Sequence, residues 1–526
     1  MEIGVKYCGG CNPRYDRKKI VELLMERFSH SFEPADEDRE YDMLVVLCGC
    51  SSCCAGIEQY KVKNRNILMV RSCDDLEAAV GAIRNLREGD FVDWKDIYAG
   101  KLVTAAEAVA NIKSGNRVVV GHAVGEPVEL VEAMVANKDN YKDVEVVHMV
   151  AMGKGEYAKE GMEDHFHVNS IFAGATTKEC INSGRGDFTT SYFYQVPGLF
   201  EKGYMPVDVA LVQLSEPDEH GYCSFGVSND YTKPAADNAG IIIAEVNKQM
   251  PRTYGESFIH VSDIDYIVEA DHPIIELAPP RIGDVEKAIG KHCAELVEDG
   301  STLQLGIGAI PDAVLLFLKD KKDLGIHSEM ISDGVVELVE AGVITNKKKT
   351  LHQGKSVVTF LMGTKRLYDY VNNNPAVELR PVSYVNDPTV IMKNSKMVSI
   401  NSCVQVDLMG QVCSESIGIK QISGVGGQVD FVRGVSMAKD GQGKSIIAIP
   451  STASKGKVSR IVPFLDHGAA VTTSRNDVDY IVTEYGIAQL KGKTLKDRAR
   501  ALIKIAHPDF KEGLQEEFEK RFSAKF

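Results

Sequence analysis

The chain has 526 residues, which is too long for a single hydrophobic core and predicts about two to four domains. Hydrophobic residues make up 44% and charged residues 25% of the chain, the balance of an ordinary globular protein. The formal net charge of −14 argues against nucleic acid or an anionic membrane as a partner, because either would need a basic surface. The sequence shows no apolar run of membrane-span length and no signal-peptide pattern at its start, so we expect a cytoplasmic enzyme.

The first 90 residues read as a small α/β domain. Apolar runs predict strands over 2–7, 42–47 and 66–70, and amphipathic segments predict helices over about 18–24 and 74–86. The segment that follows, residues 87–100 with the single Trp94, reads as a connector. A capping-box pattern, Thr104 followed by Glu107, then predicts a new helix start.

Twelve cysteines are distributed unevenly along the chain. Five are scattered and are expected to be buried, inert thiols: Cys180, Cys223, Cys293, Cys403 and Cys413. The others cluster near the N-terminus and form a candidate thiol site: Cys8, Cys11, Cys48, Cys50, Cys53, Cys54 and Cys73. Without a secretory signal, such a cluster favours metal or redox chemistry over disulfides.

The clustered cysteines follow the three predicted strands. If these strands are parallel, their carboxyl ends share one edge of the sheet, and the thiols converge there. Cys11 would also lie at a helix N-terminus, which lowers the pKa of a thiol. Two interpretations stay open, a metal, iron–sulfur or redox site and a structural domain with reduced cysteines, because the spacings match no standard zinc or ferredoxin pattern.

An internal repeat follows the N-terminal domain. Residues 112–121 and 297–306 share the order of helix end, glycine turn, strand and glycine. A proline follows each copy, and a short strand with a histidine comes next, His148 in one copy and His327 in the other. The repeat predicts two similar α/β halves, 96–290 and 291–526, with mostly parallel sheets. The alternative is a chance similarity between generic strand–turn–helix units.

The second copy carries a Ser328–Glu329 pair just past its histidine. One glycine loop, 306–311, precedes this pair, and another, 424–431, follows it. A carboxylate between two loops whose backbone can approach a ligand suggests covalent catalysis, although most glutamates in such a run are simply solvated. Neither loop fits the G-x-G-x-x-G fingerprint, because Pro311 and Val429 occupy the third glycine position, so a Rossmann dehydrogenase is not expected.

These motifs add up to a family resemblance. From about Trp94 to Phe526 the chain resembles the acetyl-CoA hydrolase/transferase family, closest to 4-hydroxybutyrate CoA-transferases and butyryl-CoA:acetate CoA-transferases. The first ninety or so residues fall outside the resemblance, so the chain looks like a fusion. The segments that carry it are 306–312, 325–334, 362–366, 424–431, 471–475 and 483–486.

The resemblance implies the fold and the reaction: two CoA-transferase subdomains, the second with the catalytic glutamate, that move CoA between carboxylates by a ping-pong mechanism. Glu329 matches the catalytic glutamate, which would carry CoA as a glutamyl thioester. The expected CoA contacts are Gly306, Ile307, Gly308, Ala309, Ile310, Val404, Gly426 and Gly427. Gly426 or Gly427 would also donate to the oxyanion, and 121–127 would face the acyl group. Coenzyme A is then a substrate, no cofactor is required for transfer, and a homodimer or larger oligomer is implied.

The identity of the acceptor stays open. Acetyl-CoA, butyryl-CoA or 4-hydroxybutyryl-CoA would donate to a short-chain carboxylate, and the sequence does not say which acid is preferred. One rival is an acyl-CoA hydrolase on the same scaffold, because only the exclusion of water from Glu329 separates the two activities. A rival of another class is a CoA-binding or redox-sensing protein in which the cysteine domain is the sensor.

Overall fold

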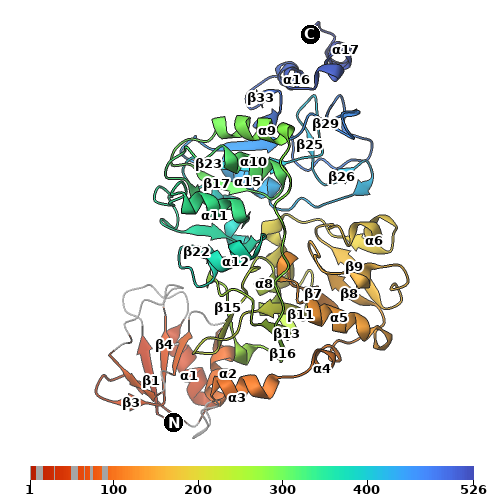
Figure 1. Ribbon diagram of the computed structural model, residues 1–526. Coiled ribbons are helices and arrows are strands. Elements are labelled where there is room, and N and C mark those ends of the chain that lie inside the picture. Colours follow the sequence, from red (N-terminus) through yellow and green to blue (C-terminus); the bar gives the residue numbers. More distant parts are fainter. Residues whose placement is uncertain are drawn as a thin grey trace. The chain divides into compact units, whose positions relative to one another are not determined.

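The computed structural model describes residues 2–7, 16–28, 30–48, 57, 59–63, 66–70, 75–85 and 93–526. The chain divides into two compact units, Met1–Asp93 and Trp94–Phe526 (Figure 1). Among the helices of the described part, none is long and apolar enough to cross a membrane.

The N-terminal unit contains a four-stranded sheet in the order β2-β1-β4-β6. Neighbouring strands are parallel, and the predicted strands and helices are confirmed. Buried apolar side chains such as Ile3, Leu24, Val45 and Ile83 form its core. The elements are β1 (Glu2–Tyr7), α1 (Arg17–Arg27), β2 (Ser31–Pro34), β3 (Glu40–Tyr41), β4 (Met43–Leu47), β5 (Lys61–Val62), β6 (Ile67–Val70) and α2 (Leu76–Asn85).

Only one cysteine of the N-terminal cluster is described. Cys48 directly follows β4 and is buried. The thiol site itself falls outside the described residues, because Cys8, Cys11, Cys50, Cys53, Cys54 and Cys73 all do. Within the described residues, no group of three or more His, Cys, Asp or Glu side chains is arranged to hold a metal ion. A metal or iron–sulfur centre therefore has no support from the structure.

The scattered cysteines are free and buried, as predicted. Burial raises the pKa of Cys223 and of Cys293 to about 12, and it raises the pKa of Cys180 and Cys403 as well. Such thiols stay protonated at neutral pH, which leaves them unreactive.

The larger unit begins with a helix where a connector was predicted. Helix α3 spans Trp94–Lys101, so the connector prediction is wrong from Trp94 onwards. Trp94, Ile97 and Tyr98 have helical spacing and pack against the core of the unit. Trp94 Nε1 also donates to the backbone oxygen of Glu219 at 3.0 Å. The capping box at Thr104 is confirmed, and it opens α4 (Ala105–Val109).

The first half of this unit, up to β16, is built on a seven-stranded sheet in the order β10-β9-β8-β7-β11-β13-β16. All of its neighbouring strands are parallel. The strands are β7 (Arg117–Val120), β8 (Val144–Val147), β9 (Phe166–Ser170), β10 (Gly186–Phe188), β11 (Val207–Leu214), β13 (Ala239–Asn247) and β16 (Tyr266–Ala270), and the helices after α4 are α5 (Val128–Ala136), α6 (Lys178–Asn182), α7 (Val196–Glu201) and α8 (Thr232–Asp237).

The second half, from α9 onwards, is built on an eight-stranded, mostly parallel sheet in the order β21-β19-β17-β23-β28-β32-β33, with β18 paired to β17. Its strands are β17 (Thr302–Leu305), β18 (Gly325–Ile326), β19 (Met330–Ile331), β21 (Phe360–Leu361), β23 (Met397–Ser402), β28 (Lys444–Ala448), β32 (Tyr480–Thr483) and β33 (Gly486–Gln489). Its helices are α9 (Asp284–Glu295), α10 (Ala309–Leu316), α11 (Asp333–Glu340), α12 (Lys365–Val371), α13 (Val382–Val385), α14 (Pro388–Ile391), α15 (Gln428–Ser436), α16 (Leu495–Lys504) and the closing α17 (Pro508–Phe522).

Small sheets complete the unit. One of them joins the halves, because β14 (Tyr254–Gly255) of the first half pairs with β22 (Val377–Leu379), which pairs with β20 (Ser356–Val358). The others pair β12 (Tyr222–Ser224) with β15 (Phe258–His260), β24 (Gln405–Asp407) with β25 (Val412–Cys413) and β31 (Ile461–Val462), β26 (Ser416–Ile417) with β27 (Lys420–Gln421), and β29 (Thr452–Ala453) with β30 (Val458–Ser459).

The two halves repeat one unit, as the sequence predicts. In the first half β7 leads through a glycine loop into α5, and β8 returns parallel to β7. In the second half β17 leads through a glycine loop into α10, and β18 returns parallel to β17. His148 directly follows β8 and His327 directly follows β18, so the repeat places them at corresponding strand ends.

Candidate active site

The segment after β18 reverses direction and presents Glu329. Strand β18 runs parallel to β17, whereas β19 runs antiparallel to it, so the chain turns back over His327, Ser328 and Glu329. The Ser328 hydroxyl accepts from the backbone N–H of Leu305 at 3.2 Å and donates to the backbone oxygen of Met330 at 2.7 Å. The serine therefore fixes the reversal to the end of β17.

His327 anchors the same reversal from its other side. Its Nε2 lies 2.8 Å from the backbone oxygen of Val385, to which it donates. Burial lowers the pKa of His327 to about 3, so the ring is neutral at physiological pH. Val385 directly precedes Asn386, so this hydrogen bond couples the position of the His–Ser–Glu run to that of Asn386.

The Glu329 carboxylate lies against Asn386 and Gly427. Asn386 Nδ2 donates to Glu329 Oε2 at 2.7 Å, and Asn386 is itself buried. A Cβ atom on Gly427 would overlap both Glu329 Oε2 and Asn386 Nδ2. Only glycine fits there, and its absent side chain is what lets the backbone of the second glycine loop approach the carboxylate.

The surroundings of Glu329 change its ionisation. Burial raises the pKa of Glu329 from 4.5 to about 7, although hydrogen bonds from Asn386 and the Gly427 backbone and the nearby His122 oppose the shift. The side chain nevertheless remains partly exposed, so a reacting group can reach it. A desolvated but reachable carboxylate with a pKa near neutrality is typical of a catalytic residue.

A second carboxyl group, Asp430 on α15, shares this environment. Its Oδ2 accepts from the backbone N–H of Tyr194 at 3.1 Å and lies 3.4 Å from Asn386 Nδ2. Burial, together with the charge of Glu329, raises the pKa of Asp430 well above its usual range. A neutral Asp430 leaves Glu329 as the charged member of the pair, with Asn386 between them.

The second glycine loop also rests on the first half. A Cβ on Gly424 would lie 2.8 Å from the backbone oxygen of Ile171, and a Cβ on Gly426 would lie 3.2 Å from the Phe172 ring. Gly426 has a φ of 51°, a conformation that favours glycine. The backbone N–H of Phe193 donates to the backbone oxygen of Gly426 at 3.3 Å. Both halves therefore shape the loop that contacts Glu329.

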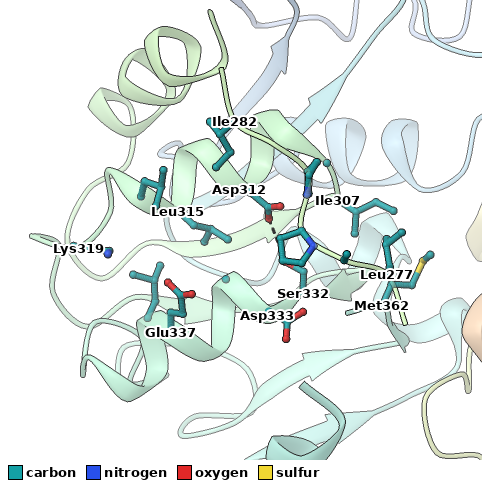
Figure 2. A pocket seen from close by; sticks show the side chains of 17 residues that line it. Leu277, Ile282, Ile307, Asp312, Leu315, Lys319, Ser332, Asp333, Glu337 and Met362 are labelled. Carbon is teal, nitrogen blue, oxygen red and sulfur yellow. Dashed lines mark hydrogen bonds between the residues drawn. The ribbon is translucent and has the colours of Figure 1, made fainter. Parts of the chain in front are cut away.

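The first glycine loop borders a cavity beside the segment that follows Glu329. The cavity has a volume of about 140 Å³ (Figure 2). Ile307, Leu277 and Met362 lie at one end of it, and Lys319 and Glu337 lie at the other. Ser332 and Asp333, which follow the Glu329 segment, line this cavity, whereas Glu329 itself does not.

The remaining predicted contacts are spread along one sheet edge. Gly306 follows β17 and Val404 lies just beyond β23, and because these neighbouring strands are parallel, both residues lie at their carboxyl ends. In the structure Gly427 therefore contacts Glu329, and Gly426 precedes Gly427 in the same loop. Residues 306–310 and Val404 lie at the edge of the sheet.

Sequence reasoning missed Asn386 and gave no role to Asp430 or His122. Asn386 precedes Asp387 and Pro388, which form an ordinary N-cap and first turn of α14, so the local pattern reads as structural. His122 lies in the first half's glycine loop, and its Nδ1 is 3.0 Å from Asp230 Oδ2. The only signal for His122 was its place in the loop expected to face the acyl group.

Comparison with known proteins connects this geometry to an enzyme family. The acetyl-CoA hydrolase/transferase N-terminal domain model matches residues 87–279, and the C-terminal domain model matches residues 363–518. The 4-hydroxybutyrate coenzyme A transferase of Clostridium kluyveri is 73% identical over 82% of this chain and 100% of its own length. The chain belongs to the acetyl-CoA hydrolase/transferase family. Residues 2–87 match a family of uncharacterised proteins, so the N-terminal unit is an addition to the transferase part.

Other relatives agree. The butyryl-CoA:acetate CoA-transferase of Anaerostipes caccae is 39% identical over 82% of this chain and 98% of its own length. The crystal structure of a 4-hydroxybutyrate CoA-transferase from Porphyromonas gingivalis is 48% identical with a TM-score of 0.71, covering 82% of this chain and 100% of that one. RipA from Yersinia pestis is 40% identical with a TM-score of 0.78 and the same coverage. The predicted CoA-transferase activity and the predicted α/β fold are therefore both confirmed. Coenzyme A is the family's substrate.

Proposed function

We propose that this enzyme moves CoA between a short acyl-CoA and a short carboxylic acid, with 4-hydroxybutyrate as an acceptor and Glu329 as the nucleophile. The observation that carries the proposal is the Glu329 carboxylate, partly exposed yet desolvated enough for a pKa of about 7, and held against Gly427. The Clostridium kluyveri relative, at 73% identity, supports the choice of acid.

The first half-reaction transfers CoA to the protein. A Glu329 oxygen attacks the thioester carbonyl, the C–S bond breaks, and an acyl-glutamyl anhydride and CoA thiolate form. The thiolate then attacks the glutamyl carbonyl, the anhydride C–O bond breaks, and the first carboxylate leaves. The product is a glutamyl-CoA thioester, and an incoming carboxylate returns along the same steps to give the new acyl-CoA. No net proton is gained or lost.

Each step passes through a tetrahedral oxyanion that needs hydrogen-bond donors. The candidate donors are Asn386 Nδ2, which donates to Glu329 Oε2 at 2.7 Å, and the backbone N–H groups of Gly426 and Gly427 in the loop beside Glu329. Because a carboxylate is a weak nucleophile, the site must also hold the thiolate close and exclude water. The aromatic ring of Phe172, which lies beside Gly426 of the second glycine loop, supplies apolar cover.

Three loops at the site are suited to hold coenzyme A. Gly306 to Ile310 and Val404 lie at the carboxyl ends of two neighbouring parallel strands, where ligands bind in α/β folds. Gly426 and Gly427 complete the set next to Glu329. Fixed in this way, the CoA sulfur would stay near the glutamyl carbonyl between the two half-reactions.

The proposal extends to the organisation of the chain. Its parts are a cysteine-rich domain of unknown role at 1–90 and two transferase subdomains at 96–290 and 291–526, assembled as a homo-oligomer in the cytoplasm. The resemblance to the family supports the subdomains, the oligomer and the location.

The dependence of product formation on an acceptor tests the proposal. The protein is incubated with acetyl-CoA, with and without 4-hydroxybutyrate, and acyl-CoA species and free CoA are quantified by chromatography. A transferase forms 4-hydroxybutyryl-CoA and acetate in equal amounts and releases little CoA without the acid. Equal release of free CoA in both reactions would show a hydrolase and refute the proposal.

A further inference from the structure

A buried histidine of the first half has one ring nitrogen without a hydrogen-bond partner among the described residues. His122 follows β7, and only 2% of its surface is exposed. Its Nδ1 lies 3.0 Å from Asp230 Oδ2. Its Nε2 has no hydrogen-bond partner within the described residues, and it is not one of the unpaired side-chain atoms that are fully shielded from solvent. The small exposed part of His122 therefore includes Nε2.

Asp230 determines the orientation of that ring. Its carboxylate is fully buried and accepts hydrogen bonds from the Ser228 hydroxyl at 2.6 Å, the Tyr231 backbone N–H at 2.6 Å and the Thr232 backbone N–H at 3.3 Å. Since all of these groups donate, the carboxylate is the acceptor for His122 as well, and Nδ1 bears the proton. A hydroxyl group can both donate and accept a hydrogen bond, so it can pair with Nε2 in either protonation state of the ring.

The surroundings of His122 are aromatic. The ring centroid of Phe360 is 4.6 Å away, that of Tyr231 is 5.5 Å away and that of Phe193 is 5.7 Å away. Tyr231 directs its hydroxyl away to the backbone oxygen of Val120, at 2.7 Å. The Nε2 atom of His122 is thus a polar point in an apolar wall, which is the arrangement that selects a ligand with one matching polar group.

This wall adjoins the reacting carboxylate. The backbone N–H of Phe360 donates to the backbone oxygen of Glu329 at 3.2 Å, and that of Phe193 donates to Gly426 at 3.3 Å. His122 therefore contacts both the ring of Phe360, whose backbone is bonded to Glu329, and the ring of Phe193, whose backbone is bonded to Gly426. It is also close enough for its charge to lower the pKa of Glu329.

We propose that Nε2 of His122, oriented by Asp230, forms a hydrogen bond with a hydroxyl group on the acyl chain and so selects hydroxylated short-chain acids over unsubstituted acids of the same length. This inference rests on the proposed function. Butyrate, which lacks the hydroxyl group of 4-hydroxybutyrate, would leave Nε2 without a partner, and sites built to bind a substrate hydroxyl reject the analogue that lacks it. In this account His122 determines specificity and Asp230 is a positioning residue.

The test compares 4-hydroxybutyrate with butyrate as acceptors, with acetyl-CoA as donor. We expect the wild-type protein to prefer 4-hydroxybutyrate. His122→Phe keeps an aromatic ring but removes both nitrogens, and it should lower the ratio of kcat/KM for 4-hydroxybutyrate to kcat/KM for butyrate about 10- to 100-fold, in addition to any loss that both acids share. His122→Leu, as a second variant, and Asp230→Asn should shift the same ratio in the same direction.

A matched control exists in the same half. His167 Nε2 lies 3.0 Å from Asp187 Oδ2, a similar pair whose side chains are 39% and 74% exposed. His167→Phe should leave the ratio of the two acids unchanged. Partial unfolding of a variant lowers both rates together and leaves the ratio intact, so the readout survives a stability defect.

Two results would overturn the inference: equal losses for both acids in the His122 variants, or a wild-type protein that does not distinguish the acids. Failure of the proposed function looks different, because the wild-type protein would then transfer CoA to neither acid.

Discussion

The two halves of the transferase unit each place a histidine directly after the corresponding strand, but what surrounds it differs. In the first half, His148 Nδ1 is 2.7 Å from the Tyr157 hydroxyl, and its Nε2 is 3.8 Å from Glu126 Oε2. In the second half, His327 donates to the backbone oxygen of Val385, and the reversal after it presents Glu329. Both histidines are buried, and burial lowers the pKa of each.

The difference extends to the nearby carboxylates. Glu126 is 1% exposed and accepts hydrogen bonds from the backbone N–H groups of Met152 and Gly153, at 3.0 and 2.8 Å. Glu329 remains partly exposed. One strand–loop–helix design therefore supports two outcomes: a buried carboxylate that ties loops together, and a reachable one that can attack a substrate.

The strongest test of this contrast removes each carboxylate in turn. Glu329→Gln should lower the transfer rate at least about 1000-fold, because the nucleophile is lost. Glu126→Gln should lower thermal stability but leave the remaining folded protein able to transfer CoA. Initial rates per folded protein, measured after a check by circular dichroism, distinguish the two variants. Similar losses of rate in both would remove the functional distinction between the halves.

A smaller effect is expected from crowding the Glu329 carboxylate. Gly427→Ala places a Cβ where Glu329 Oε2 and Asn386 Nδ2 lie, and the displacement should cost about 100-fold in kcat. Gly513→Ala is the control, because a Cβ at that helical position meets no atom within 4 Å. Steady-state kinetics of both variants provide the measurement, and a fully active Gly427→Ala would contradict the described site.

The pH dependence sharpens the comparison further. Only the ionised form of Glu329 attacks, and burial raises its pKa from 4.5 to about 7. The value of kcat/KM should therefore fall about tenfold between pH 8 and pH 6. A pH–rate profile with its acid limb near 4.5 would show that the carboxylate is not desolvated in the free enzyme.

An effect is also expected on stability, and its sign follows from the same shift. Between pH 4.5 and about 7 the folded state holds a proton on Glu329 that the unfolded chain has released, so this group lowers stability as the pH rises. Glu329→Gln should therefore raise the free energy of unfolding by about 3 kcal/mol at pH 8 and have little effect at pH 4. Urea unfolding followed by Trp94 fluorescence measures it, and a destabilised variant at pH 8 would contradict the assignment.

Much of the fold could be predicted from local pattern. The N-terminal strands are continuous apolar runs, and the repeat of glycine, strand and glycine gave the two similar halves. Helix α3 was missed because Trp94, Ile97 and Tyr98 reveal a buried face only once the core they pack against is known.

The site was predicted less completely, for a physical reason. Glu329 and the glycine loops form recognisable runs, but the contact between Glu329 and Gly427 joins segments far apart in the chain. Asn386 has no local signature, since its neighbours form a normal helix start. The pairing of His122 with Asp230 likewise depends on how the loops of the first half meet in space.

The central claim is that Glu329 carries CoA during the reaction, and mass spectrometry of the protein after brief incubation with acetyl-CoA tests it most directly. The account predicts a CoA-sized adduct on the peptide that contains Glu329, removed by added acetate and absent from Glu329→Gln, whereas the exposed Glu340→Gln retains it. Continued turnover with no adduct on that peptide, or an adduct that persists in Glu329→Gln, would contradict the claim.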